Sequence, residues 1–243
     1  MSETRVLPGT QQLMQAAAEI VTQLAKQAVI QRGRFSLVLS GGSTPRALYR
    51  LLATSPYQDE IEWANVHVFW GDERCVPPDD AESNYRMARA SLLDHVAIPP
   101  TSIHRICGEL SPEDASDDYT QTLVSFFRDG IPRFDLVLLG MGDDGHTASL
   151  FPHTAALNET QKWVTANYVP QKDVWRITLT LPVINAARQV IFLVAGAPKA
   201  ERLREVLYGP RQPHDLPAQS IQPTNGNLLW LVDAAAASTL PHT

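Results

Sequence analysis

The stretch that most constrains the fold is residues 134–152, which read FDLVLLGMGDDGHTASLFP. Leu136 to Leu139 form an apolar run typical of a buried strand, and the run breaks at Gly140. The glycine-rich turn that follows delivers His146 to a segment that we predict to be helical. A strand that ends in such a turn places polar groups at the carboxyl edge of a sheet, where open α/β folds bind ligands. We therefore expect a catalytic base, if the chain has one, to lie here.

This turn also matches a dinucleotide-binding fingerprint, but its charges argue against that function. Residues 140–145, GMGDDG, fit the pattern G-x-G-x-x-G. In that fingerprint the backbone N–H groups cup a pyrophosphate, and Asp143 and Asp144 would repel the anion. The acid expected roughly 20 residues later is hard to place, since Glu159 comes too early and the strand predicted at 163–169 ends without one. The sequence therefore favours another ligand.

A second strand, glycine turn and helix are predicted within residues 35–52, with SGGSTP as the turn. We expect Ser43 or Thr44 to cap the helix and Pro45 to suit its first position. Free N–H groups around Gly42, two hydroxyls and the positive helix end would together form a phosphate cradle. The alternative is an ordinary strand–helix turn. The segment is neither a P-loop nor a nucleophile elbow, because neither pattern is present.

The remaining elements extend this alternation of strands and helices. Further strands are predicted at 66–70, 102–106, 163–169, 174–181, 189–195 and 228–232, further helices at 11–31, 83–93, 111–129 and 200–207, a loop at 209–222 and a frayed tail after 233. Polar clusters follow the carboxyl ends of the strands. We therefore predict a single domain over residues 1–243, a three-layer α/β/α fold with a largely parallel, Rossmann-like sheet and one cleft.

Charged side chains follow several of these strands. Asp72, Glu73 and Arg74 come directly after one, where they either form a solvated turn or aim a carboxylate and a guanidinium into the cleft. Arg176 and Lys199 lie at strand-associated positions, where they are either surface charges or the cations of a phosphate site. Together with the glycine turn, these residues favour a phosphorylated small molecule as the ligand.

His146 is the best candidate for a general base, because a neutral imidazole accepts a proton near neutral pH. Either Asp143 or Asp144 would orient its ring, as an aspartate does in a hydrolytic triad. One alternative is a histidine that merely caps a helix. Another is a metal site that also includes His153, but the spacing fits no standard zinc pattern. Since no activated nucleophile is evident, the simplest proposal is that His146 activates a water molecule.

Composition excludes several classes of function. The net charge of −6 at pH 7 argues against nucleic-acid binding, although a few local cations suffice for one phosphate. No apolar run approaches the ~20 residues of a membrane span, and no signal-peptide pattern is present. With Cys75 and Cys107 as the two cysteines, we expect a reduced, cytoplasmic protein. It would act on a small phosphorylated molecule as a monomer or small homo-oligomer.

Several motifs together resemble one enzyme family. They are SGGSTP (40–45), GDER and SNYRMA (within 71–88), GMGDDGHTASLFP (140–152), RITLT (176–180) and GAPK (196–199). With them the chain resembles the 6-phosphogluconolactonases of the oxidative pentose phosphate pathway, and more distantly the glucosamine-6-phosphate isomerase/deaminases that share their fold. The long histidine motif is the most specific of these signals.

The resemblance implies hydrolysis of 6-phosphoglucono-δ-lactone without a metal or cofactor. It implies His146 as the base that activates water and Arg74 as the group that stabilises the substrate or the oxyanion. We add Asp144 to the catalytic residues as the acid predicted to orient His146. The residues implied to bind the substrate or its phosphate are Gly42, Ser43, Thr44, Asp72, Glu73, Asn84, Arg176 and Lys199. One departure from the family pattern is His153, where glycine is expected, and it bears only on local loop shape.

Two other functions stay open on the sequence. An isomerase/deaminase needs more acid/base groups, and those relatives carry a carboxylate shortly after the histidine, whereas residues 147–152 contain none. A non-catalytic sugar-phosphate-binding protein would keep the phosphate cradle but would not need His146 with its neighbouring acids. The hypothesis of a lactonase accounts for both features.

Overall fold

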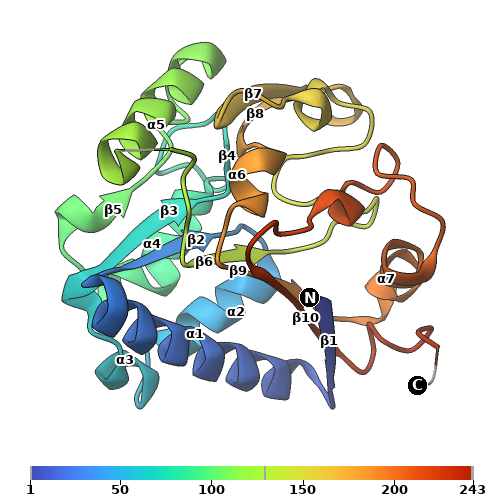
Figure 1. The fold of residues 1–243 in the computed structure, drawn as a ribbon, viewed down its shortest axis with the longest axis horizontal. Helices are drawn as coiled ribbons and strands as arrows, with labels where there is room; N and C mark the ends of the chain where they lie inside the picture. The colour runs from blue at the N-terminus through green and yellow to red at the C-terminus, as the bar shows by residue number, and fades with distance from the viewer. Residues whose placement is uncertain (1, 129, 242–243) are drawn as a thin grey trace.

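The computed structural model describes residues 2–128 and 130–241. Its centre is a seven-stranded sheet in which every paired neighbour runs parallel (Figure 1). Across the sheet the strands are β1 (Ser2–Leu7), β10 (Asn227–Asp233), β9 (Gln189–Val194), β6 (Leu136–Leu139), β2 (Phe35–Leu39), β3 (Val66–Trp70) and β5 (Ile103–His104). The predicted α/β fold with a largely parallel sheet is thereby confirmed.

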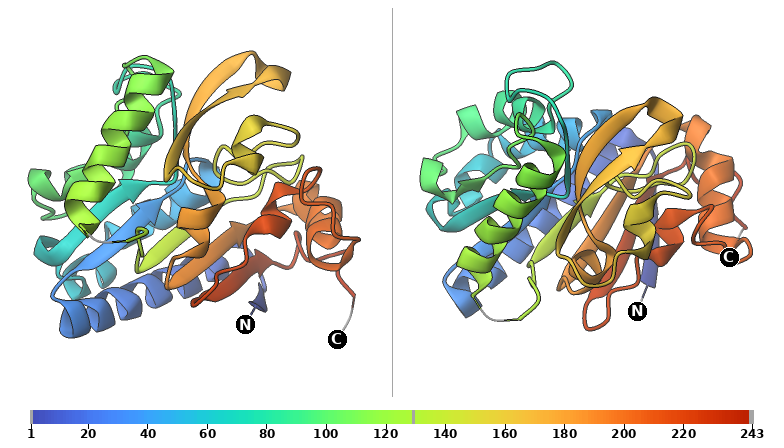
Figure 2. Two further views of the ribbon diagram at one scale, coloured as in Figure 1. Left: turned by 45° about the horizontal axis from the view of Figure 1, so that its top comes forward. Right: turned by 90° about the horizontal axis from the view of Figure 1, so that it is seen from above.

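Helices cover both faces of this sheet (Figures 1 and 2). One face carries α1 (Thr10–Arg32), α2 (Ser43–Leu52), α3 (Tyr57–Glu60) and α4 (Asn84–Ser91), and the other carries α5 (Pro112–Phe127), α6 (Leu181–Asn185) and α7 (Ala200–Tyr208). None of the helices in the described residues is both long and apolar enough to cross a membrane.

A second, antiparallel sheet of three strands begins where β3 ends. It consists of β4 (Asp72–Arg74), β8 (Val174–Leu179) and β7 (Val164–Val169), and α5 packs against it. The short 3-10 turn η5 (Pro170–Lys172) joins β7 to β8 as a hairpin. In the register of this sheet Arg74 lies opposite Arg176, so two arginines that are distant in the chain become neighbours.

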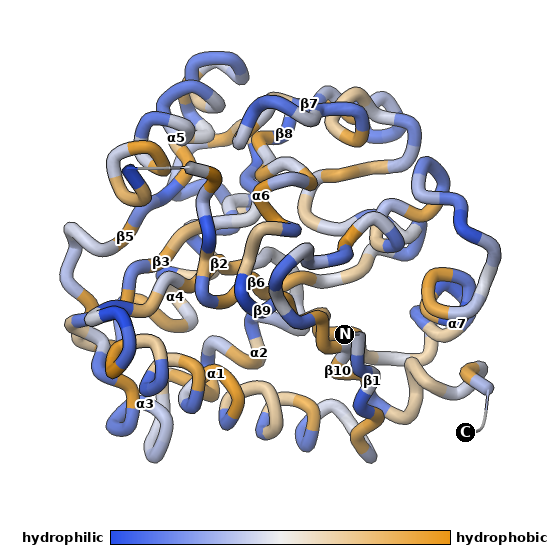
Figure 3. Tube along the Cα trace, in the orientation of Figure 1, coloured by the Kyte–Doolittle hydropathy of each residue, from blue (hydrophilic) through white to orange (hydrophobic). Residues whose placement is uncertain are grey.

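Apolar periodicity explains the main layers. Leu13, Ala17, Val21 and Ala28 are buried along one face of α1, and every residue of β2 is buried. Figure 3 shows this as alternating orange and blue along α1. Full burial of one leucine side chain contributes roughly 2 kcal/mol, so these faces fix how the helices lie on the sheet. Helix α1 ends at Gly33, whose φ of 72° is the left-handed conformation that favours glycine.

The strand order places a topological switch point between β2 and β6. From β2 the chain moves outward to β3 and β5, then returns to β6 on the other side of β2 and continues outward through β9 and β10. Ligands of open α/β sheets bind at the carboxyl ends of the strands that flank such a point. Both glycine turns singled out in the sequence follow these two strands.

Several local predictions were wrong. No helix follows His146, because residues 140–154 form an irregular loop. Helix α2 begins at Ser43 with Gly42 as its N-cap, so neither hydroxyl residue caps it. The edge strand β1 was not predicted, and its polar, exposed sequence explains why. The tail is not frayed at its start, since Ala236 is fully buried; residues 242–243, and residue 129 at the predicted end of α5, lie outside the described residues.

Candidate active site

A cavity of about 290 Å³ lies at the switch point. Its walls come from the turn after β2, the strand β4, the start of α4, the loop after β6 and the β7–β8 hairpin. The sequence-predicted site residues that line it are Gly42, Asp72, Arg74, Asn84, His146 and Arg176. Candidate residues that are widely separated in the chain therefore share one cavity.

The loop after β6 holds His146 against its own backbone. Gly142 donates its N–H to the carbonyl of His146 at 2.9 Å, and Gly145 donates to the carbonyl of Gly142 at 3.1 Å. A Cβ atom on Gly142 would lie 2.1 Å from His146 Nδ1, which no side chain permits. The glycine at position 142 therefore makes room for the imidazole.

Asp144 is the acid that orients His146. Its Oδ1 lies 2.5 Å from Nδ1 of the ring and also accepts the backbone N–H of His146 at 3.0 Å. Partial burial raises the pKa of Asp144, but the hydrogen bonds and charge of His146 outweigh it and lower that pKa to about 2. An ionised carboxylate can only accept, so Nδ1 carries the hydrogen and Nε2 carries the free lone pair.

Asp143 makes a different set of contacts that anchor the loop. Its Oδ1 lies 2.5 Å from Lys199 Nζ, and its carbonyl accepts from Arg202 Nε at 2.9 Å. Ala218, in the segment after α7, donates its N–H to the carbonyl of Gly145 at 2.9 Å. The loop that carries His146 is thus held from the C-terminal part of the chain.

Phe151 covers one side of the base. Its ring stacks on the imidazole of His146 with centroids 3.9 Å apart and an angle of 23° between the planes. The ammonium of Lys172, in η5, lies 5.2 Å from the centroid of the same ring. All three residues line the cavity.

Asp72 is buried and accepts hydrogen bonds from two neighbouring side chains. Its Oδ2 accepts from Ser149 Oγ at 2.7 Å, and its backbone carbonyl accepts from Asn84 Nδ2 at 2.9 Å. These bonds tie the loop after β6 to β4 and to the start of α4. Asn84 also explains Gly41, since a Cβ there would lie 2.1 Å from its Oδ1.

Glu73 holds the start of α4 and does not line the cavity. Its two oxygens accept the backbone N–H groups of Arg74, Asn84 and Tyr85, each at 2.8 Å, and the hydroxyl of Ser83 at 3.1 Å. Burial raises the pKa of Glu73, while the backbone hydrogen bonds oppose this shift. We infer that Glu73 positions Asn84, and a direct contact with a ligand stays a prediction.

Arg74 and Arg176 give one wall a positive charge. Arg74 donates to the carbonyl of Glu82 and lies 3.7 Å from its carboxylate. Arg176 has no carboxylate within 4.0 Å among residues 2–128 and 130–241. Its burial and the positive charge of Arg74 lower the pKa of Arg176, while Asp72 opposes the shift. Two crowded guanidinium groups with little compensating charge favour an anionic ligand at this wall.

The other sequence-predicted residues lie around the cavity without lining it. Ser43 and Thr44 form the first turn of α2 beside Gly42, whose φ of 107° favours glycine. Asp144 is hydrogen-bonded to Nδ1 of His146, and Lys199 pairs with Asp143. Sequence reasoning missed the lining residues Ser149, Phe151 and Lys172. Ser149 and Phe151 belong to the histidine motif, which was the available signal, whereas nothing in the sequence marks Lys172.

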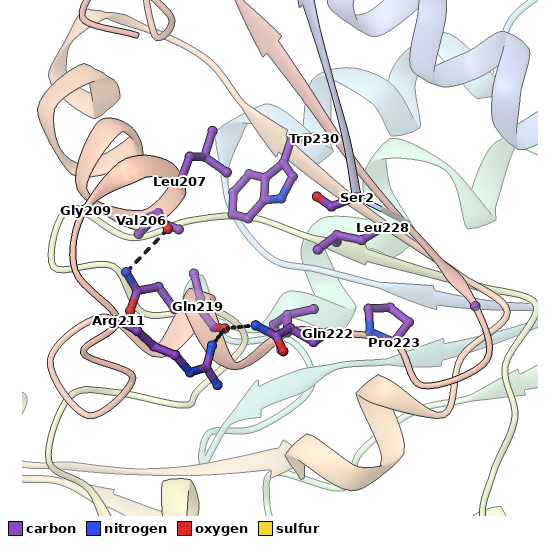
Figure 4. Close-up of a pocket in the computed structure, with 13 residues that line it drawn as sticks. Ser2, Val206, Leu207, Gly209, Arg211, Gln219, Gln222, Pro223, Leu228 and Trp230 are labelled. Carbon is purple, nitrogen blue, oxygen red and sulfur yellow. Dashed lines mark hydrogen bonds between the residues drawn. The ribbon is translucent and has the colours of Figure 1, made fainter. Parts of the chain in front are cut away.

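Two further observations delimit the site. Within the described residues, no group of three or more His, Cys, Asp or Glu side chains is arranged to hold a metal ion. A larger cavity of about 410 Å³ lies between α7, the segment after it and β10 (Figure 4). Its lining, which includes Leu207, Arg211 and Trp230, contains no histidine, cysteine or carboxylate. It therefore offers no acid or base, and we place the chemistry in the smaller cavity.

Comparison with known proteins gives consistent matches over nearly the whole chain. Residues 8–230 match the model of the family described as glucosamine-6-phosphate isomerases/6-phosphogluconolactonase. The chain is 45% identical to a 6-phosphogluconolactonase of Synechocystis over 97% of both chains, and 45% identical to one of Nostoc over the same share. It is also similar to the solved structure of 6-phosphogluconolactonase from Trypanosoma brucei, with a TM-score of 0.87, 30% identity and 99% of both chains covered.

Proposed function

Because the chain belongs to the family of glucosamine-6-phosphate isomerases and 6-phosphogluconolactonases, we propose that it hydrolyses 6-phosphoglucono-δ-lactone to 6-phosphogluconate. This is the lactone-opening step of the oxidative pentose phosphate pathway. The observation that carries the proposal is that His146, which is paired with Asp144, lines a cavity together with two arginines. A polarised imidazole provides the base, and the arginines match the charge of a phosphorylated substrate.

The geometry supports a base-activated water. Nε2 of His146 takes a proton from water as the water oxygen bonds to the lactone carbonyl carbon. The resulting oxyanion is stabilised by the positive wall that includes Arg74, a contact of a kind typically worth ~3 kcal/mol. The tetrahedral intermediate then collapses, the bond from the carbonyl carbon to the ring oxygen breaks, and His146 returns the proton to that oxygen. The product is an open-chain carboxylic acid, which loses its remaining proton to solvent and becomes the carboxylate.

Asp144 makes this cycle possible by fixing the tautomer of the ring. Its ionised carboxylate holds the hydrogen on Nδ1 and stabilises the imidazolium that forms during attack. The N–H groups around Gly42, together with Ser43, Thr44, Asn84 and Arg176, would hold the sugar phosphate. Asp72 keeps two of the cavity walls together through Ser149 and Asn84.

The test is hydrolysis of freshly made 6-phosphogluconolactone, measured against its spontaneous background with wild type and His146→Ala in parallel. Loss of a general base should lower kcat by roughly 10²–10⁴-fold. Full activity in the variant would mean that a residue other than His146 is the general base. A wild type that does not accelerate hydrolysis would exclude the lactonase, and glucosamine 6-phosphate would then be the next substrate, although residues 147–152 lack the carboxylate that we associate with the deaminases.

A further inference from the structure

The cavity of about 410 Å³ beside α7 has a wall that one buried side chain holds together (Figure 4). The side-chain amide of Gln219 donates to the carbonyls of Glu205 at 3.2 Å and Pro210 at 3.0 Å. Its oxygen accepts the backbone N–H of Gln212 at 2.7 Å. Gln219 thus joins the end of α7 to the segment after it, so the shape of this cavity is fixed by buried hydrogen bonds.

Most of the lining is apolar. The indole of Trp230, on β10, is 2% exposed, and it stacks on Phe192 with ring centroids 3.8 Å apart, which holds it in place. The other apolar side chains of the lining are Val206, Leu207, Ala218, Ile221, Pro223 and Leu228. Cavities of this size with mostly apolar walls are typical of sites for small molecules. We therefore expect a ligand with an apolar body.

The lining contains a single charged side chain, the guanidinium of Arg211. Its Nη1 donates to the carbonyl of Gln219 at 3.1 Å, and the side-chain amide of Gln222 donates to the same carbonyl at 3.3 Å (Figure 4). Within residues 2–128 and 130–241, no carboxylate lies within 4.0 Å of Arg211. A guanidinium with further N–H donors and no acidic partner binds a carboxylate through two parallel hydrogen bonds.

We propose that this cavity is a second ligand site, and that its ligand is a small carboxylate with an apolar body. The apolar body contacts Trp230 and its neighbours, and the carboxylate pairs with Arg211 beside Gln222. A polyhydroxylated sugar lactone has no apolar body to fill such a cavity, so the two cavities select different ligands. The inference does not rest on the proposed function, because no residue of this cavity takes part in the proposed hydrolysis.

The experiment uses 1-naphthaleneacetate as the probe and 1-naphthaleneacetamide as its uncharged counterpart, each titrated into the full chain by calorimetry. Wild type should bind the acid with a Kd on the order of 0.1 mM and the amide about tenfold more weakly, since charge-assisted contacts are of this strength. Arg211→Met, which removes the charge and keeps an apolar stem, should weaken binding of the acid about tenfold and leave the amide unchanged. Arg211→Lys should restore part of the loss. The control is Arg204→Met, which removes an exposed arginine that is paired with Glu201 outside the cavity, and it should resemble wild type.

Nuclear magnetic resonance of the isotope-labelled protein locates the probe. The indole N–H signal that is missing from Trp230→Phe identifies Trp230, and in wild type this signal should shift when the acid is added. Binding that leaves the signal unmoved would place the probe in another part of the molecule and would overturn the proposal. Equal affinities for the acid and the amide, full affinity in Arg211→Met, or no binding at millimolar probe would overturn it too. A chain that lacks lactonase activity but gives the expected titrations would exclude the proposed function and keep this site.

Discussion

Two glycine turns lie next to each other at the switch point, and they are built in different ways. The turn after β2 leads directly into α2, so its shape is maintained by the hydrogen bonds of a regular helix. The turn after β6 leads into an irregular loop, which is maintained by Asp144, by Lys199 and Arg202 through Asp143, and by Ala218. The first turn is thus held by local contacts and the second by contacts with distant segments; in the proposed mechanism the first binds the ligand and the second positions the base.

This difference predicts where the effect of a mutation appears. Changes in the turn after β2 should alter stability and KM, because they alter a helix end that holds the ligand. Changes in the loop after β6, or in its distant anchors, should alter kcat, because they move His146. Four variants test this division, in order of decreasing effect.

Gly142→Ala should have the largest effect. The new Cβ would lie 2.1 Å from His146 Nδ1, so the imidazole must leave its position beside Asp144. Displacement of the base should lower kcat by roughly 10²–10⁴-fold, as its removal would. Circular dichroism should show an intact fold. Retention of most of the activity would mean that the loop tolerates a moved histidine, and that the position of His146 does not depend on this turn.

Gly42→Ala should affect stability first. Gly42 has a φ of 107°, where a residue with a Cβ is strained by about 1–3 kcal/mol. We expect a lower free energy of unfolding in urea and a higher KM for the phosphorylated lactone, with kcat close to that of wild type. A fall in kcat as large as that of Gly142→Ala would show that the two turns are not functionally distinct.

Lys199→Met distinguishes anchoring from phosphate binding. If Lys199 acts by holding Asp143, its loss should lower kcat by roughly three- to tenfold, or about 1 kcal/mol, with KM little changed. If Lys199 instead contacts the phosphate, KM should rise and kcat should stay constant. Steady-state kinetics with 6-phosphogluconolactone separates these results, and Lys26→Met, which removes an exposed lysine outside the cavity, is the control.

Asp144→Asn should lower kcat, because Asp144 fixes the tautomer of His146, but its effect on stability should be the smallest of the four and should depend on pH. The pKa of Asp144 is about 2, below the ordinary value of about 3.9. A lowered carboxyl pKa contributes stability above pH 4, and this contribution is lost as the pH falls through 2. Since the side chain is 46% exposed, we expect a contribution below about 1 kcal/mol. The difference in unfolding free energy between wild type and variant should therefore shrink by about half near pH 3.

Much of the fold could be predicted from the sequence because strands of a parallel sheet are buried on both faces. The run at β6 is continuous and apolar, the runs at β2 and β3 are each interrupted by one polar residue, Ser36 or His67, and the predicted limits of all three agree with the structure. The strand β1 was missed because an exposed edge strand carries no such run. The helix predicted after His146 does not form, because hydrogen bonds within the turn occupy the backbone of His146. Its N–H donates to the side chain of Asp144, and its carbonyl accepts from the N–H of Gly142.

The candidate site was predictable only in part. His146, Arg74, Asn84 and Arg176 could be identified because they belong to motifs, and the structure brings them together. The partners of Asp143 and Lys199 could not be predicted, because contacts between distant segments leave no local pattern. Lys172 could not be found either, since a single lysine in a polar turn resembles any surface charge.

The walls of the cavity come from both halves of the chain, and this sets the order in which structure and activity can appear. No contiguous half of the protein contains the cavity, and the segment that anchors Asp143 comes late in the sequence. A chain that is still being synthesised can form α1 and the β2–β3 pair, but it should have no enzyme activity, because β10 and the residues that anchor Asp143 come late in the sequence. On refolding, contacts between such distant segments form slowly. Recovery of lactone hydrolysis therefore reports the last step of folding, after the recovery of helical structure.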